Sequence, residues 1–314
     1  MLRYTLRRLA LVIPILFALS IIAFLYAYAL PGDPVTAMLG TTGNQAARES
    51  LRRELGLDRP ILEQYLSWLA NALQGNLGLT FRGGQPIGPY ILSRIPATLE
   101  LALAALFVGL VIALPSGIVA GMRKNSRLDY FFSVFSLLGY SIPLFWTGYL
   151  LLLLFAVNLR VLPTQGYVPF LEDPIRNLTF LVLPALSLGL LIAPFMARMV
   201  RTAVIETLQE PFIGYARAKG LRNRIIFVRY ILRNALVSVL VVLGLNLGYL
   251  LGGQIIIEEM FNWPGAGRVI IGGVRERDYF VIQAAILVYA TLFIFINLVV
   301  ELVHGWLDPR VQLK

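Results

Sequence analysis

The chain has 314 residues, of which 58% are hydrophobic and 14% charged, and its mean hydropathy is +0.76. A soluble domain carries about 25% charged residues, so this composition excludes an ordinary soluble protein and indicates an integral membrane protein. The chain has no cysteine and one histidine, His304. A disulfide framework, a thiolate site and a histidine-rich metal cluster are therefore excluded, and we expect no metal site.

Six predominantly apolar runs are long enough to cross a hydrocarbon core of about 30 Å as helices. They lie at residues 9–30, 98–121, 130–157, 178–197, 236–257 and 282–304. We therefore predict an all-α polytopic protein with six transmembrane helices in a single transmembrane domain, residues 1–314. The first run resembles a secretory signal because Ala27-Tyr28-Ala29 follows it. Its length and the five later runs favour a first helix that is retained.

The basic residues predict the orientation, because cytoplasmic loops carry an excess of Lys and Arg. Sixteen of the 27 lie on one side, at the N-terminus, between spans 2 and 3, between spans 4 and 5 and in the C-terminal tail. The other side is nearly balanced by acids. Both termini are therefore expected in the cytoplasm. This arrangement and contact with anionic lipid headgroups explain the net charge of +10, so we predict a lipid bilayer and no nucleic acid as a partner.

An extracytoplasmic insert, residues 31–97, separates the first two spans. Within it Pro60 is a good first residue for a helix. Apolar residues then recur at helical spacing, which predicts an amphipathic helix; they are Leu62, Tyr65, Leu66, Leu69 and Leu73. Two interpretations stay open: a small cap that packs on the ends of the spans, or a docking surface for an external partner.

The third span contains Pro143, which we expect to kink or interrupt the helix. Tyr140 and Ser141 precede it and are candidates for lining a translocation pathway. Such residues are also common as polar groups that only pack against other helices, and this alternative stays open.

The segment 198–235 is a basic cytoplasmic loop with two predicted helices. Pro211 suits a first turn and Gly220 a helix C-terminus, so the first helix is short. Phe212, Tyr215 and Ala216 are spaced to form its apolar face.

The second helix of the loop follows Gly220. Its predicted apolar stripe is Leu221, Ile225, Val228, Leu232 and Leu236, with Arg222, Arg229 and Arg233 on roughly the opposite side. An interfacial helix on anionic lipid accounts for this second helix. It does not account for a separate short helix ended by glycine.

The last two spans carry further candidates. Asn246 and Tyr249 share a face of span 5, and Asn297 lies in span 6; all three are expected to line the pathway or to pack. Gly244, Gly248 and Gly252 form a small-residue face that permits close approach of another helix, in this chain or in a second subunit. Between these spans, residues 258–281 contain Pro-Gly and Gly pairs that predict a folded elbow, with Phe261 and Trp263 at the membrane interface.

Several segments resemble, in the same order, the dipeptide/oligopeptide (peptide/nickel-type) family of ABC-importer permeases. They are "LRYTLRRL", "PGDP", "LGLDRPILEQYLSWLANALQGNLGLTF", "PATLELALAA", "GYSIPLFWTGYLLL", "GYARAKGL", "VRYILRNAL", "IIIEEMFNWPGAGR" and "RDYFVIQ". The resemblance covers nearly the whole chain. It departs from general importers at the loop, where Gly214-Tyr215-Ala216 replaces Glu-Ala-Ala and the later proline is missing.

The resemblance implies a type I importer permease in the bacterial cytoplasmic (inner) membrane. It implies three partners: a second homologous permease, cytoplasmic ABC ATPase subunits and an extracytoplasmic substrate-binding protein. The short helix would be a coupling helix that fits a groove on the ATPase. Its coupling residues would be Phe212, Tyr215, Ala216, Arg217, Ala218, Lys219 and Gly220.

ATP hydrolysis is not expected in this chain. A P-loop needs a Gly-Lys pair before Ser or Thr, and none of the three lysines, Lys124, Lys219 and Lys314, follows a glycine. No hydrolase motif is present either, so we predict no catalytic residue and no cofactor here, with ATP and Mg bound by the partner ATPases. We expect transport of di- or oligopeptides. The alternatives are glutathione or nickel complexes as cargo, or an ion-coupled secondary transporter, which the scarcity of intramembrane acids disfavours.

Overall fold

The computed structural model describes residues 2–29, 33–39, 44–81 and 83–307. Side chains are described in these ranges except at residues 2–7, 37, 140, 235–246, 248, 249 and 303–307. The described chain is helical, and its only β-pairing is one isolated bridge between Leu79 and Pro86. The expectation of an all-α fold is confirmed.

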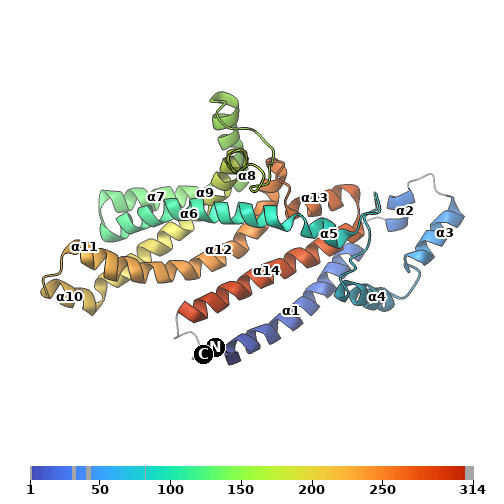
Figure 1. Ribbon diagram of the computed structural model, residues 1–314, viewed down its shortest axis with the longest axis horizontal. Helices are drawn as coiled ribbons and strands as arrows, with labels where there is room; N and C mark the ends of the chain where they lie inside the picture. Colours follow the sequence, from blue (N-terminus) through green and yellow to red (C-terminus); the bar gives the residue numbers. More distant parts are fainter. Residues whose placement is uncertain (1, 30–32, 40–43, 82, 308–314) are drawn as a thin grey trace. The chain divides into compact units, whose positions relative to one another are not determined.

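Each predicted span coincides with helical structure (Figure 1). The helices are α1 (Leu2–Ala29), α6 (Ile95–Met122), the pair α7 (Arg127–Ser141) and α8 (Leu144–Leu151), α9 (Pro174–Gln209), α12 (Arg233–Met260) and α14 (Tyr279–Leu307). Among the described residues, four helices are long and apolar enough to cross a membrane, or five if the α7–α8 pair counts as one. The protein is therefore a multi-pass membrane protein.

The third span is interrupted, as Pro143 predicts. Helix α7 ends at Ser141, and Ile142 adopts an extended conformation because a residue before proline is disfavoured in the α region. Helix α8 begins at Leu144, and the π-helix η1 (Leu152–Asn158) continues it. The two halves meet at an angle of 102°.

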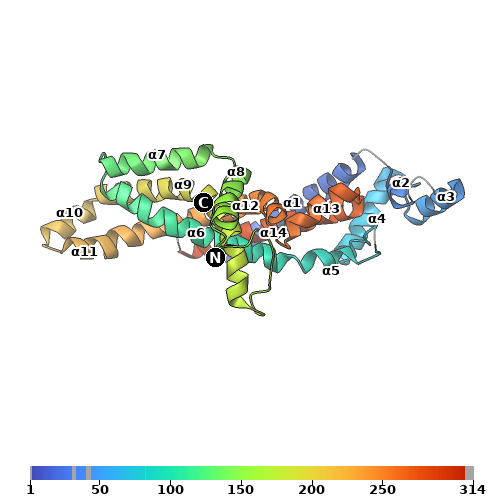
Figure 2. The same ribbon diagram turned by 90° about the horizontal axis from the view of Figure 1, so that it is seen from above.

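The chain folds as two compact units, and the first comprises residues 99–263 and 296–314. In it α7 and α12 pack along α9, and both views show these helices side by side (Figures 1 and 2). Close approach is made at glycines of α6 and α9. A Cβ atom on Gly117 would lie 2.5 Å from the carbonyl oxygen of Ala197, and one on Gly189 would lie 2.5 Å from Val108. Only glycine, which has no Cβ atom, fits at these two positions.

These contacts differ from the small-residue face that we expect in span 5. A Cβ on Gly252 would meet no atom within 4 Å, so this glycine packs against nothing within the described chain. Gly244 and Gly248 lie outside the residues whose side-chain environment is described.

Helix α9 is longer than predicted. It runs for 36 residues, which corresponds to about 54 Å, and therefore continues past the expected end of span 4 at residue 197. The first twelve residues of the predicted cytoplasmic loop, 198–209, are thus part of a rigid helix rather than of a connection. Membrane length predicts where a span leaves the bilayer, but not where the helix ends.

The second unit comprises residues 2–98 and 264–295. It contains α1, the insert helices α2 (Pro34–Leu39), α3 (Gln45–Glu54), α4 (Ile61–Leu73) and α5 (Ile87–Leu92), then α13 (Ala266–Glu276) and the start of α14. Its buried core joins α5, α13 and α14 through Ile87, Ile91, Val269, Ala284 and their neighbours. The predicted elbow is therefore a helix with one face in this core.

Asp278 ties the insert to the start of α14. One carboxylate oxygen, Oδ1, accepts a hydrogen bond from the backbone N–H of Val281 at 3.1 Å, which caps the helix. The other oxygen, Oδ2, accepts one from the N–H of Phe81 at 2.6 Å. Burial raises the pKa of Asp278, and these backbone donors oppose the shift.

Helix α4 begins where Pro60 predicts, but only part of its predicted apolar face packs. Tyr65 is its one buried residue: its hydroxyl lies 2.9 Å from the hydroxyl of Ser20, and its ring makes an edge contact with Phe24. The apolar side chains that we expect beside it are largely exposed, namely Leu62, Leu66 and Leu73. Contacts of the Tyr65 and Trp68 rings with Phe24 of α1, rather than the leucines, hold this helix.

Candidate functional site

The predicted coupling helix is present as α10 (Pro211–Ala218), separated from α9 by a sharp break. Glu210 stands in the extended region, with φ −67° and ψ 138°, as a residue before proline prefers. Its N–H donates to the carbonyl of Thr207 at 3.2 Å, while the N–H of Ile213 donates to the carbonyl of Glu210 at 3.0 Å. Pro211 thus ends one helix and begins the next.

The C-terminus of α10 is a Schellman motif centred on Gly220, which has a φ of +71°. The N–H of Leu221 donates to the carbonyl of Ala216 at 3.2 Å, and the N–H of Gly220 donates to the carbonyl of Arg217 at 2.9 Å. A Cβ on Gly220 would meet nothing within 4 Å. The glycine is therefore required by the left-handed backbone and not by lack of space.

Two residues of α10 are buried, and only one of them, Ala216, belongs to the apolar face predicted from the spacing. Ile213 and Ala216 enter a core cluster with Val200 and Val204 of α9. Leu110 and Leu114 of α6 pack against the same cluster. Residues of α6, of α9 and of the segment 226–232 share this cluster, so the buried side of the short helix is packed against three stretches of chain.

The predicted apolar face of Phe212, Tyr215 and Ala216 is divided by this packing. Tyr215 is 71% exposed and Phe212 37% exposed, although the Phe212 ring lies 6.2 Å from that of Tyr230. Ala216 is buried, so it positions the helix and is not accessible to a partner. Arg217, Ala218, Lys219 and Gly220 are exposed, which leaves one apolar ring, two cations and the turn on the outer side.

The second helix of the loop also buries a different face. It consists of α11 (Asn223–Ile225) and the π-helix η2 (Ile226–Leu232), and the buried side chains are Ile226 and Ile231. The stripe that we expect is wrong for Ile225 and Val228, which are exposed, and Leu236 lies outside the described side chains. A π-turn places residues i and i+5 on one face, whereas the prediction assumes α-helical spacing.

An ion pair that sequence reasoning missed fixes the N-terminal end of α7 to α9. Arg201 donates from Nε to Asp129 Oδ1 at 2.6 Å and from its terminal nitrogen to Oδ2 at 2.8 Å. Asp129 is almost fully buried and also accepts from the N–H of Asn125 at 2.9 Å. A bidentate pair of this kind holds both groups in one geometry. The two residues are 72 positions apart, so no local pattern relates them.

A second polar cluster, also missed, joins α6, α9 and the loop after η1. Asn177 donates to Glu100 at 2.6 Å and to the carbonyl of Val168 at 2.7 Å, and the Tyr167 hydroxyl donates to Glu100 at 3.3 Å. Burial and the Glu100 carboxylate raise the pKa of Tyr167 to about 12, so this phenol stays protonated at neutral pH. Its ring meets that of Trp263 edge-on at 4.7 Å. Trp263 and Phe261 are buried within the protein, so neither ring is exposed to lipid.

The pathway role of the predicted residues stays a prediction, because most of their side chains lie outside the described ones. Ser141 is exposed and its hydroxyl donates to the carbonyl of Leu137 at 3.1 Å, while Asn297 is half-buried. The side chains of Tyr140, Asn246 and Tyr249 lie outside the described residues. Within the described ranges no group of three or more His, Asp or Glu residues is arranged to hold a metal ion.

Comparison with known proteins shows the family to which the chain belongs. The family described as "binding-protein-dependent transport system inner membrane component" matches residues 113–313, and the model of its N-terminal part matches residues 1–102. The di/tripeptide transport system permease protein DppB of Pseudomonas aeruginosa (strain UCBPP-PA14) is 39% identical over 335 residues, with 99% of each chain covered. The glutathione transport system permease protein GsiC of Escherichia coli (strain K12) is 37% identical over 314 residues, with both chains fully covered.

A solved structure shows the same fold. A chain of the MetNI methionine ABC transporter, in an inward-facing conformation, aligns with a TM-score of 0.58 and 20% identity, covering 69% of this chain and 96% of that chain. These findings confirm the resemblance to importer permeases that the ordered sequence segments carry. The chain belongs to the family of inner-membrane components of binding-protein-dependent transport systems.

Proposed function

We propose that this chain is a transmembrane permease subunit of an ATP-driven peptide importer and that α10 is its contact with the motor. The observation that carries the proposal is the construction of α10. It is held by buried residues on one side, Ile213 and Ala216, and leaves Tyr215, Arg217 and Lys219 free on the other. A rigid base with an exposed aromatic ring and cations is what transmission of movement to a second protein requires.

The path from α10 into the membrane supports this role. Helix α9 runs without interruption from the break at Glu210 back to Pro174, and the core around Ile213 includes residues of α6 as well. The Arg201–Asp129 pair adds α7 to the same assembly. A displacement of α10 therefore moves three helices together, as a rigid-body change needs.

The energy source is assigned to separate ATPase subunits that bind ATP and Mg. The sequence has no Gly-Lys pair from which a P-loop would be built, and hydrolysis therefore has to be supplied by another polypeptide. The family's name, a component of a binding-protein-dependent system, supports an extracytoplasmic substrate-binding protein as a further partner. A second, homologous permease completes the proposed pathway, of which this chain forms one half.

The proposed topology is six spans with both termini in the cytoplasm. Support comes from the surplus of basic residues at the N-terminus, at residues 123–127 and at residues 198–233. Helix α12 occupies the position of the fifth predicted span, 236–257, and 28 residues suffice to cross a bilayer. With this orientation α10 faces the cytoplasm and the insert faces the outside.

Peptides are the proposed cargo, with glutathione as the second candidate. The di/tripeptide permease and the glutathione permease are similarly related to this chain, at 39% and 37% identity. Glutathione is itself a peptide with an unusual linkage, so one pathway chemistry suits both. Nickel complexes are a weaker candidate because the chain has no cysteine and one histidine.

The test is ATP-driven uptake by the complete importer in proteoliposomes, supplied with its binding protein and either a dipeptide panel or glutathione. Tyr215→Asp places a charge where the proposal puts an apolar anchor. A hot-spot contact contributes about 2 kcal/mol or more, so we expect roughly 30-fold weaker association with the ATPase and loss of uptake. Tyr215→Phe is the matched control and retains uptake.

Two results would contradict the proposal. Normal uptake by Tyr215→Asp would remove the coupling role of α10. Uptake driven by a proton or sodium gradient with no ATPase subunit present would establish the secondary-transporter alternative instead.

A further inference from the structure

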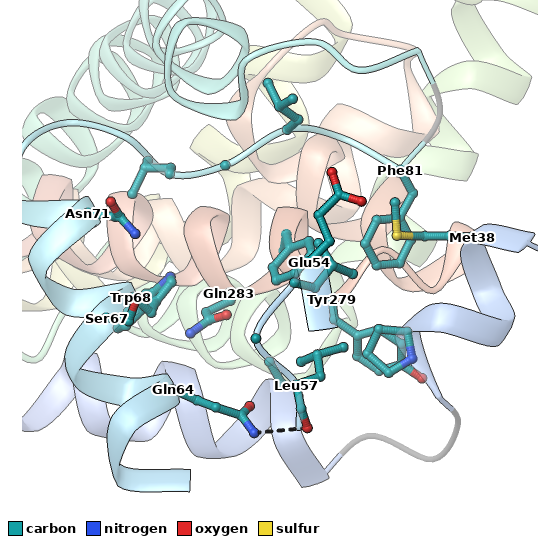
Figure 3. Close-up of a pocket in the computed structure, with 18 of the residues that line it drawn as sticks. Met38, Glu54, Leu57, Gln64, Ser67, Trp68, Asn71, Phe81, Tyr279 and Gln283 are labelled. Carbon is teal, nitrogen blue, oxygen red and sulfur yellow. Dashed lines mark hydrogen bonds between the residues drawn. The ribbon is translucent and has the colours of Figure 1, made fainter. Parts of the chain in front are cut away.

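The second unit contains a cavity of about 530 Å³ that none of the proposed roles uses. It is lined by the C-terminal end of α1, the turn between α3 and α4, the helix α4, residues 76–81, Gly84 and the first turns of α14 (Figure 3). All these parts belong to one compact unit. Sites for small ligands commonly have about 300–1,000 Å³, so the volume suits a small molecule.

The lining combines aromatic walls with side-chain amides. Rings are supplied by Phe24, Trp68, Phe81, Tyr279 and Phe280. The amides are those of Gln64, Asn71, Asn76 and Gln283. An amide side chain offers both a donor and an acceptor, as a peptide bond does. A wall of this composition matches a ligand that alternates apolar groups with amides.

Gln283 presents an unpaired buried donor to the cavity. It extends from α14 into this space (Figure 3), its side chain is only 4% exposed, and its Nε2 has no hydrogen-bond partner. A buried donor without a partner is costly and needs an explanation. The other glutamine of the cavity shows the contrast. Gln64 Nε2 donates to the carbonyls of Leu57 at 3.3 Å and Arg59 at 2.9 Å, so both of its N–H donors are used in holding the turn.

Charges of opposite sign complete the lining. Glu54 and Arg59 are both exposed residues of the cavity wall, one at each end of the turn between α3 and α4. A short peptide at neutral pH carries an ammonium group at one end and a carboxylate at the other. Arg59 suits the carboxylate and Glu54 the ammonium, since opposite charges attract and fix orientation.

We propose that this cavity is a peptide-binding subsite of the permease itself, in which Gln283 donates to a backbone carbonyl of a short peptide. The inference rests on the proposed function, because it places the same class of cargo at a second position. An acyl chain of a lipid would pack against the aromatic walls. It would leave the amide donor of Gln283 without a hydrogen-bond partner and the charges of Glu54 and Arg59 without counter-charges. The subsite would hold a peptide on the side of the membrane where the binding protein delivers it.

The absence of cysteine from this chain allows a direct test. Ser67→Cys introduces a thiol in the cavity wall, and Ala70→Cys introduces one on the exposed surface of the same helix. Each variant is prepared as the complete importer in nanodiscs without binding protein, and the rate of maleimide labelling of this subunit is followed while a dipeptide with one aromatic side chain is added. We expect the peptide to slow labelling at Ser67→Cys in a saturable manner and not at Ala70→Cys.

Gln283→Leu, combined with Ser67→Cys, tests the donor. Loss of one buried hydrogen bond should weaken protection about tenfold, which corresponds to about 1.4 kcal/mol. Gln74→Leu, outside the cavity, is the matched control and should leave protection unchanged. A purely structural Gln283 would change the thermal stability of the importer without changing the peptide concentration that gives half protection.

Equal labelling of the two thiols at all peptide concentrations would overturn the proposal, as would protection by phospholipid or detergent monomers alone. ATP-driven uptake with the binding protein is measured on the same preparations. Uptake without protection rejects the subsite and leaves the importer function standing. Protection without uptake supports the subsite and counts against the proposed importer function.

Discussion

Helices α10 and α4 carry the same kind of amphipathic pattern but are held in different ways. Helix α10 has eight residues and buries two of them in a core shared by α6, α9 and η2. Helix α4 has 13 residues, yet only Tyr65 is buried, and its leucines reach exposures of 53% at Leu66 and 81% at Leu73. The shorter helix is thus the more firmly packed against its neighbours.

The difference shows that burial is decided by neighbours and not by the strength of the pattern. A helix of two turns is not stable in isolation, so α10 depends on its seat, its initial proline and its glycine terminus. Helix α4 is long enough to present an apolar side outward after its aromatic contacts with α1 have fixed it. Helix α10 is therefore suited to transmit force, and helix α4 to receive a partner or lipid.

The largest expected effect on stability comes from removing a buried contact between α10 and the core around it. Ile213→Ala removes a fully buried side chain and should lower the free energy of unfolding by about 2–5 kcal/mol. Leu66→Ala removes an exposed side chain of α4 and should change it by less than about 0.5 kcal/mol. Denaturant unfolding of the two variants in the same detergent measures both. Similar losses would show that the two helices do not differ as described.

A smaller and opposite pair of effects separates backbone from packing within α10. Added Cβ atoms at Gly214 and Gly220 would meet nothing within 4 Å, so neither substitution by alanine causes a clash. Gly220→Ala forces a left-handed residue and should destabilise by about 1–2 kcal/mol, whereas Gly214→Ala should stabilise the helix by up to about 1 kcal/mol. Thermal unfolding should shift in opposite directions. Shifts of one sign would mean that the Schellman geometry does not hold.

The smallest effect on stability is expected at the exposed face of α4. Leu62→Ser should leave the thermal transition within error because the side chain is already exposed. If the face docks a protein, the affinity of the substrate-binding protein for the importer should fall several-fold in surface plasmon resonance. An unchanged affinity would assign the face to lipid and leave the comparison with α10 intact.

Much of the candidate site was predictable because it depends on residues with local backbone rules. Pro211 and Gly220 predict the beginning and end of α10, and Pro143 predicts the interruption of the third span. The faces were not predictable in the same way. The spacing did not indicate that Ile213 rather than Phe212 would be buried. Ile226 and Ile231 are buried in place of the expected stripe because η2 has π-helical spacing.

By itself the sequence determined that this is a helical membrane protein, where its helices break, which side its charges favour and to which family it belongs. These follow from hydropathy, from the fixed φ of proline, from the left-handed freedom of glycine and from ordered motifs, all of which act within a short stretch. Only the tertiary structure decided that Arg201 meets Asp129, that Ala216 is buried and that Gln283 faces a cavity. Each of these depends on residues far apart in the chain, whose meeting no local periodicity encodes.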